Sequence, residues 1–157
     1  MATISMQSSR FGKVEVDETD LLSINGGILG FPNSDRFVVL DHEQDSPFKW
    51  LQSIEEPEIA FAITDPQAFF PDYHIQIKRE EIASLDVRDG DELMIFVILS
   101  LKAAPQDMTA NLQGPIIVNI RSRKGRQIVL KGTKYMTRHP LFPLLQPENQ
   151  ENKEKTT

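Results

Sequence analysis

The chain has 157 residues, of which 39% are hydrophobic and 25% charged, with 8 Gly, 10 Pro and no Cys. This length and composition are typical of one globular domain, and the lack of cysteine excludes disulfide scaffolds, zinc–thiolate sites, iron–sulfur clusters and thiol nucleophiles. The net charge of −6 argues against a general nucleic-acid binder, because the phosphate backbone attracts positive charge.

Alternation of apolar and polar side chains predicts a chain made mostly of strands. Expected strands cover residues 11–16, 36–41, 48–51, 58–64 and 73–78. In the last of these, Tyr73, Ile75 and Ile77 alternate with polar residues, which is the pattern of a half-buried strand. Glycines and prolines separate the runs at intervals of about 8–12 residues, which indicates an all-β, mostly antiparallel sandwich or small barrel with very little helix.

The second half of the chain contains the most apolar segment. Residues 78–85 predict a two-turn helix, and residues 93–101 are apolar on both faces, as in a central strand that is buried on both sides. Residues 115–121 and 126–131 predict a hairpin whose loop is Arg123-Lys124-Gly125. We expect one domain over residues 1–145, and a disordered polar tail over residues 146–157, which lack apolar side chains.

No part of the sequence predicts a membrane segment. The apolar run 93–101 has nine residues, whereas a membrane helix needs about 20. The first ten residues lack the apolar core of a signal peptide. We therefore expect a cytoplasmic protein with no membrane partner.

Charge is unevenly distributed along the chain. Residues 1–100 hold 19 acidic and 7 basic residues, a net of −12, and residues 101–157 hold 4 acidic and 10 basic residues, a net of +6. The basic residues concentrate between Arg121 and Arg138. This asymmetry predicts either two faces of opposite potential or two charge sets that the fold brings side by side.

Motifs of catalysis and cofactor binding are missing. Gly26-Gly27-Ile28-Leu29-Gly30 lacks the spacing of a phosphate-binding loop, and His42, His74 and His139 share no metal-ligand spacing. We expect no enzyme activity, cofactor, metal or small-molecule substrate. The alternative is a ligand-binding or enzymatic barrel that uses Asp65, Asp72 and His74, together with Tyr73, near one mouth.

Two stretches contain residues that are unusual for their context. Phe69 and Phe70 lie in a loop that is bracketed by prolines. Either one ring is buried in the core and the other ring covers it, or both form an apolar binding patch with Asp65 and Asp72 at its rim. Asparagines interrupt the strand-like stretch 109–119, where they either bond to neighbouring backbone or contribute to a binding surface.

These stretches together resemble the flagellar assembly factor FliW family. The matching pieces, in order, are GILGFP at 27–32, PFKWLQS at 47–53, AFAITDP at 60–66, FPDY at 70–73, TANLQGPIIVN at 109–119 and GRQIVL at 125–130. Six pieces in the family's order and spacing make the resemblance specific over residues 10–142.

The resemblance implies a non-enzymatic regulator that binds flagellin and CsrA, a small RNA-binding repressor of flagellin translation, without binding nucleic acid directly. Partner exchange would couple flagellin synthesis to filament assembly. On this basis, the expected partner-binding residues are Asp65, Phe69, Phe70, Asp72, Tyr73, Asn111, Pro115 and Asn119.

Overall fold

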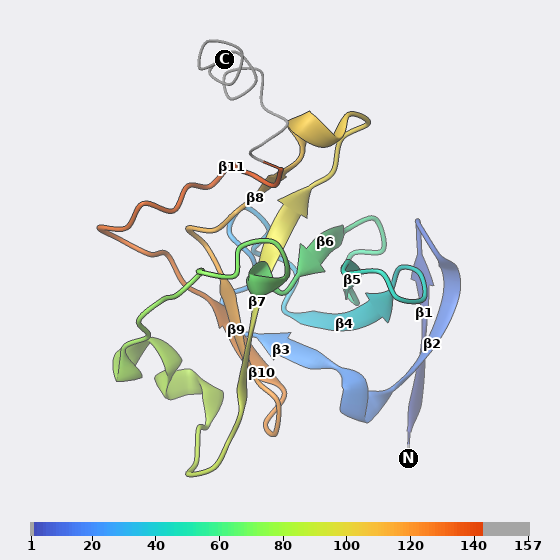
Figure 1. Cartoon of the computed structure of the whole chain (residues 1–157). Helices are drawn as coiled ribbons and strands as arrows, with labels where there is room; N and C mark the ends of the chain where they lie inside the picture. The colour runs from blue at the N-terminus through green and yellow to red at the C-terminus, as the bar shows by residue number, and fades with distance from the viewer. Residues whose placement is uncertain (1, 143–157) are drawn as a thin grey trace.

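The computed structural model describes residues 2–142 and consists mostly of β-strands (Figure 1). The strands are β1 (Thr3–Ser8), β2 (Gly12–Asp17), β3 (Leu22–Ile24), β4 (Arg36–Asp41), β5 (Lys49–Ser53), β6 (Ala60–Thr64), β7 (Leu93–Ser100), β8 (Thr109–Ala110), β9 (Ile116–Asn119), β10 (Lys124–Gln127) and β11 (His139–Pro140). Short 3-10 helices lie at η1 (Glu18–Asp20), η2 (Pro66–Ala68), η3 (Arg79–Leu85) and η4 (Pro105–Asp107). The predicted tail 146–157 lies outside the described residues.

Within the described chain, seven strands close into a barrel in the order β7-β6-β5-β4-β3-β10-β9, with β9 returning to β7. All pairs in this ring are antiparallel except β3 with β10. This closure confirms the all-β, mostly antiparallel expectation, and it removes the open sheet edges that a flat sheet would leave.

The strand β7 closes the barrel because it pairs along both of its edges. Residues Val97–Leu99 pair with β6, and Leu93–Phe96 pair with β9 on the other edge. Farther along that second edge, Leu99 and Ser100 pair with β8, which in turn pairs with β11. The central position predicted for 93–101 is confirmed, although only Phe96, Val97 and Leu99 are buried and Met94 is exposed.

The barrel interior is filled by apolar side chains. Its main cluster consists of Leu22, Ile24, Ile28, Phe37, Leu51, Ile63, Phe96, Ile116 and Val118. The hairpin β1–β2 forms a separate two-stranded sheet beside the barrel, where Met6 and Val16 pack on Val38 (Figure 1). The 3-10 helix η3 packs Leu85 and Ile82 against Ile117, Ile128 and Leu130, as the sequence predicted for the inward face of 78–85.

The prediction of a strand at 73–78 is wrong. These residues have no strand pairing, although their burial alternates, with Tyr73, Ile75 and Ile77 inward. The side chains pack onto clusters that two different sheet regions form, while the backbone stays beyond the reach of a neighbouring strand. The alternating pattern thus indicated correctly which side chains are buried. A strand also needs a neighbouring backbone to pair with, and residues 73–78 have none.

The predicted hairpin at 115–131 exists, but its loop begins three residues and ends two residues earlier than expected. The turn covers residues 120–123, where Arg123 adopts a φ of 59°, and Lys124 and Gly125 already belong to β10. A Cβ on Gly125 would lie 3.0 Å from Ile117 O and 3.0 Å from Val118 Cγ2. Gly125 is therefore needed for close packing of β10 between β9 and β3, and not for the turn.

Candidate partner-binding surface

Residues 65–73 leave the barrel at the end of β6 and form the loop that the sequence singled out. Asp65 caps η2, because its Oδ1 accepts a hydrogen bond from Gln67 N at 2.9 Å, and Pro66 occupies the first helical position. The neighbouring Thr64 Oγ1 donates to Pro47 O at 2.7 Å. The start of the loop is thereby fixed to the barrel wall.

Both phenylalanines of the loop are half-buried, so neither is a core ring with the other as its cover. Phe69 stacks on Phe48, with ring centroids 5.6 Å apart and an interplanar angle of 11°, and meets Phe142 edge-on at 5.8 Å. Phe70 meets the ring of His139 edge-on at 5.1 Å. Each ring is therefore held by neighbouring side chains while part of its surface stays accessible.

Tyr73 ends the loop and is buried, with 3% of its surface exposed. Its hydroxyl donates to Leu112 O at 2.8 Å, and burial, followed by the influence of Tyr135, raises its pKa well above the ordinary value. The rings of Tyr73 and Tyr135 lie 4.6 Å apart, and His74 N donates to the Tyr135 hydroxyl at 3.0 Å. These contacts attach the loop to residues 134–139, more than 60 positions later in the chain.

The contact between these two segments forms a groove of about 260 Å³, which we call the aromatic groove. Its lining residues are Phe69, Phe70, Pro71, Asp72, Tyr73, Leu112, Lys134, Tyr135 and His139. Asp72 and Lys134 add charges of opposite sign to an otherwise apolar and aromatic lining. Burial, with the positive charge of Lys134, lowers the pKa of His139, so its neutral form is favoured here.

The residues expected from the stretch 109–119 have internal roles in the structure. Asn111 Oδ1 accepts from Gly114 N at 2.9 Å, and Pro115 is buried with its carbonyl oxygen accepting from Ile128 N. Asn119 is fully buried, and its Nδ2 donates to Leu85 O at 3.0 Å and to Asp91 Oδ2 at 3.0 Å. None of the three lines the aromatic groove.

Three arginines of the basic stretch 121–138 are engaged within the molecule, whereas Lys124, Lys131, Lys134 and Arg138 form no ion pair among the described residues. Arg121 forms ion pairs with Asp91 at 2.9 Å and Asp86 at 3.2 Å, Arg123 donates to Asp20 O at 2.8 Å, and Arg126 donates to Glu81 O at 3.0 Å. The fold thus brings the two charge sets of the sequence side by side, which was one of the two arrangements the sequence allowed.

The carboxyl of Asp91 is the centre of this pairing. Hydrogen bonds from Arg121 and from Arg88 N lower the pKa of Asp91 to about 2, with a further contribution from Asn119. The same interaction with Asp91 raises the pKa of Arg121. The cluster fastens the turn of the β9–β10 hairpin to the segment that leads into β7.

Of the residues of the alternative enzymatic site, all but Asp72 line one groove. Asp65, Tyr73 and His74 line a second surface groove of about 440 Å³ along the start of β7, whereas Asp72 lines the aromatic groove. Asp65 is also engaged as a helix cap. In the described part of the chain, no three His, Asp or Glu side chains are grouped to hold a metal ion, and no helix there is long and apolar enough to cross a membrane.

The residues that line the second side of the aromatic groove, opposite the loop 65–73, were not predicted from the sequence. Leu112, Lys134, Tyr135 and His139 were not among the expected site residues, although Tyr135 is the only aromatic residue between Arg121 and Arg138. A lone aromatic in a polar basic stretch was the available signal.

Comparison with known proteins gives a consistent family assignment. A family model described as FliW protein matches residues 5–141. A protein of Geobacter sulfurreducens named "Flagellar assembly factor FliW" is 39% identical over 139 residues, covering 88% of this chain and 87% of its own length. A protein of the same name from Caldanaerobacter subterraneus subsp. tengcongensis is 41% identical over 140 residues, covering 88% and 93%.

A solved structure supports the same assignment. The crystal structure of a flagellar assembly factor FliW superimposes with a TM-score of 0.80 at 35% sequence identity. The match covers 92% of this chain and 99% of that one, so the similarity extends over nearly the whole of the solved chain.

Proposed function

The chain belongs to the FliW family, and from that membership we propose that it is a non-enzymatic flagellar assembly factor that binds flagellin and CsrA in the cytoplasm. By exchanging one partner for the other, it couples flagellin synthesis to filament assembly. When free flagellin is scarce, the factor withdraws CsrA and translation proceeds; when flagellin is abundant, it occupies the factor and CsrA represses again.

The observation that carries a binding role is the aromatic groove. Phe69 and Phe70 are half-buried and line the groove, and Tyr135 and Pro71 extend the apolar lining beside them. Aromatic side chains held rigidly at a groove lose little conformational entropy on binding, which is why they recur as anchors in protein interfaces. Asp72 and Lys134 supply polar groups at the same groove.

A second supporting feature is the acidic surface around hairpin β1–β2. Glu15, Glu18 and Asp20 are exposed there, and Glu55 and Glu58 are exposed in the β5–β6 connection. Ser9 N donates to Pro57 O at 3.0 Å, so the turn of the β1–β2 hairpin lies beside the β5–β6 connection. An acidic surface suits a basic RNA-binding partner such as CsrA through electrostatic complementarity.

The filled interior of the barrel favours this proposal over a ligand-binding or enzymatic barrel. Its lining consists of buried Leu, Ile, Val and Phe side chains, and the grooves described above lie on the surface. A binding barrel would instead show an interior cavity with a few convergent polar groups.

The proposal is tested by using the full chain as bait in the lysate of a flagellated bacterium that makes both partners. We expect flagellin and CsrA to be recovered, each in competition with the other. Recovery of neither partner would contradict the proposed function.

The role of the groove is tested separately with Phe70→Ala, after thermal melting has shown that the variant folds. Loss of an anchor should weaken binding of at least one partner by about 1–2 kcal/mol, or roughly 5- to 30-fold. Phe31→Ala is the matched control, since Phe31 is an exposed phenylalanine that lines none of the grooves described. If Phe70→Ala loses only stability, or behaves like the control, the groove is not the interface.

A further inference from the structure

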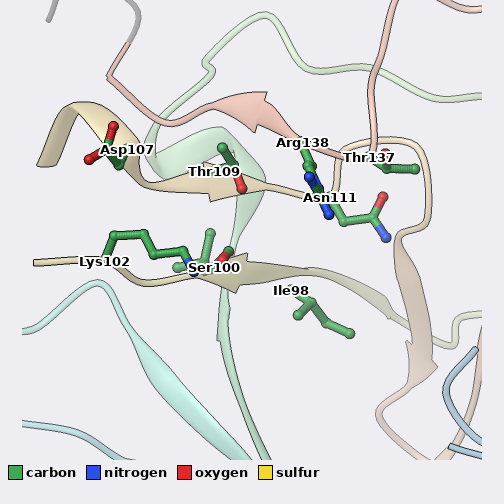
Figure 2. Close-up of a pocket in the computed structure, with 9 residues that line it drawn as sticks. Ile98, Ser100, Lys102, Asp107, Thr109, Asn111, Thr137 and Arg138 are labelled. Carbon is green, nitrogen blue, oxygen red and sulfur yellow. The ribbon is translucent and has the colours of Figure 1, made fainter. Parts of the chain in front are cut away.

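A polar groove of about 500 Å³ runs over the outer side of the β7–β8–β11 region (Figure 2). It lies away from the aromatic groove and shares no lining residue with it. The side chains that line it are Ile98, Ser100, Lys102, Asp107, Thr109, Asn111, Thr137 and Arg138.

Strand register explains why the polar side chains share this side. Ala110 pairs with both Leu99 and His139, so their neighbours Ser100, Thr109 and Arg138 point to the opposite face from these inward residues. Leu99 and Ala110 are buried in the core. The outer face is consequently built from hydroxyl, amide and guanidinium groups, together with Ile98.

The groove has a cation at each end. Figure 2 shows Lys102 with Asp107 at one end of β8, and Arg138 with Asn111 and Thr137 at the other. Among residues 2–142, neither Lys102 nor Arg138 has an ion-pair partner, although acidic residues outnumber basic ones in the chain by 23 to 17. The arginines earlier in the basic stretch are all engaged, so Arg138 differs from them.

We propose that this groove binds a short acidic peptide segment of a partner protein, with carboxylates placed at Lys102 and Arg138. Charge-assisted hydrogen bonds of this kind are about twice as strong as neutral ones, and Arg can hold a carboxylate in a bidentate manner. The hydroxyls of Ser100, Thr109 and Thr137 can donate to or accept from the peptide backbone between them.

The lining favours a peptide over a nucleic acid. It contains no aromatic side chain on which a base could stack. It also contains Asp107, which can accept a hydrogen bond from a peptide N–H. The volume lies within the range of about 300–1,000 Å³ for sites that enclose small ligands, which suits a few residues of chain.

This inference goes beyond the proposed function, because it concerns a different surface and does not depend on which protein supplies the segment. The test is a titration of the full, ¹⁵N-labelled chain with the peptide Ac-Glu-Ser-Glu-Gly-NH₂, followed by NMR. We expect saturable shifts of the Ser100, Thr109, Asn111 and Arg138 amides, and no such shifts with Ac-Gln-Ser-Gln-Gly-NH₂.

Substitutions test whether Lys102 and Arg138 are the residues that bind the carboxylates of the peptide. Lys102→Gln and Arg138→Gln should each weaken binding of the acidic peptide at least 5-fold, and Lys131→Gln, an exposed lysine that lines none of the three grooves described, should leave it unchanged. Equal shifts with both peptides, shifts that fall elsewhere, or no binding would overturn the proposal. Tighter binding of a hexauridylate at the same amides would assign the groove to nucleic acid instead. The titration measures only the binding of a short peptide. A negative result would therefore not bear on the proposed binding of flagellin and CsrA.

Discussion

At the scale of single residues, Trp50 shows how one side chain can be anchored from several sides. The indole is 8% exposed, its Nε1–H donates to His42 Nδ1 at 3.1 Å, and the Arg10 guanidinium lies 4.1 Å from the ring centroid. Phe11 meets the ring edge-on at 6.1 Å. The ring is therefore held in the core.

From this environment we predict that the native protein has blue-shifted tryptophan fluorescence that iodide quenches poorly. The chain has a single Trp, so the emission reports Trp50 alone. Arg10→Ala is expected to raise the accessibility of the ring to iodide, because it uncovers one face. Emission at the wavelength of free indole in water would show that the ring is not packed as described.

At the scale of secondary-structure elements, β7 has two kinds of positions within one strand. Val97 is fully buried, whereas Met94 is 42% exposed. We predict that Val97→Asp unfolds the domain, since an unpaired buried charge costs several kcal/mol. Met94→Asp should stay folded with nearly the same melting temperature, and circular dichroism during heating compares the two. A folded Val97→Asp protein would contradict the central position of β7.

The turn of the β9–β10 hairpin gives a prediction about pH. The pKa of Asp91 is about 2 in the folded chain, against about 3.9 in an unfolded one. Because the folded-state pKa is lower, the stabilisation is fully present above pH 4 and is lost as the pH falls from about 4 to about 2. Asp91→Asn should therefore lower the melting temperature at pH 7 and flatten its dependence on pH in that window.

The matched control for this prediction is Asp89→Asn. Asp89 is exposed in the same connection and takes part in none of the ion pairs found in residues 2–142. Its melting profile should follow that of the natural chain. Equal acid sensitivity of the Asp91→Asn variant and the natural chain would mean that other carboxylates govern stability in this range.

At the scale of the whole molecule, the charge distribution predicts how partners approach. Residues 1–100 have a net charge of −12, and the acidic residues of the β1–β2 and β5–β6 segments are exposed. Exposed charges more than about 10 Å apart are largely screened at 0.1 M salt. We predict that the association rate with CsrA falls as salt rises, while the dissociation rate changes less.

Stopped-flow or surface-based kinetics across a range of salt concentrations measures both rates. Glu15→Lys with Glu18→Lys should lower the association rate at low salt and reduce its salt dependence. An association rate that is flat from low to high salt would show that the acidic surface does not steer this encounter.

The sequence by itself determined the fold class, the family and the approximate positions of β2, β4–β7, β9 and β10, whereas β1, β3, β8 and β11 were not predicted. Alternation and turn residues are local patterns, because they depend only on neighbours along the chain. They were enough to predict β4, β6, the inward face of η3 and the hairpin β9–β10. The expectation for 73–78 was wrong for the same reason, since alternation describes burial but cannot supply a pairing partner.

Only the tertiary structure decided which distant segments meet. Closure of the sheet at β7 brings residues 134–139 to the loop 65–73 and creates the aromatic groove, and it turns Lys102 and Arg138 toward one polar groove. It also pairs Arg121 with Asp86 and Asp91, and buries Asn119, which looked like a surface candidate in the sequence. These contacts join residues tens of positions apart, and their formation depends on the register and closure of the whole barrel, which no local pattern encodes.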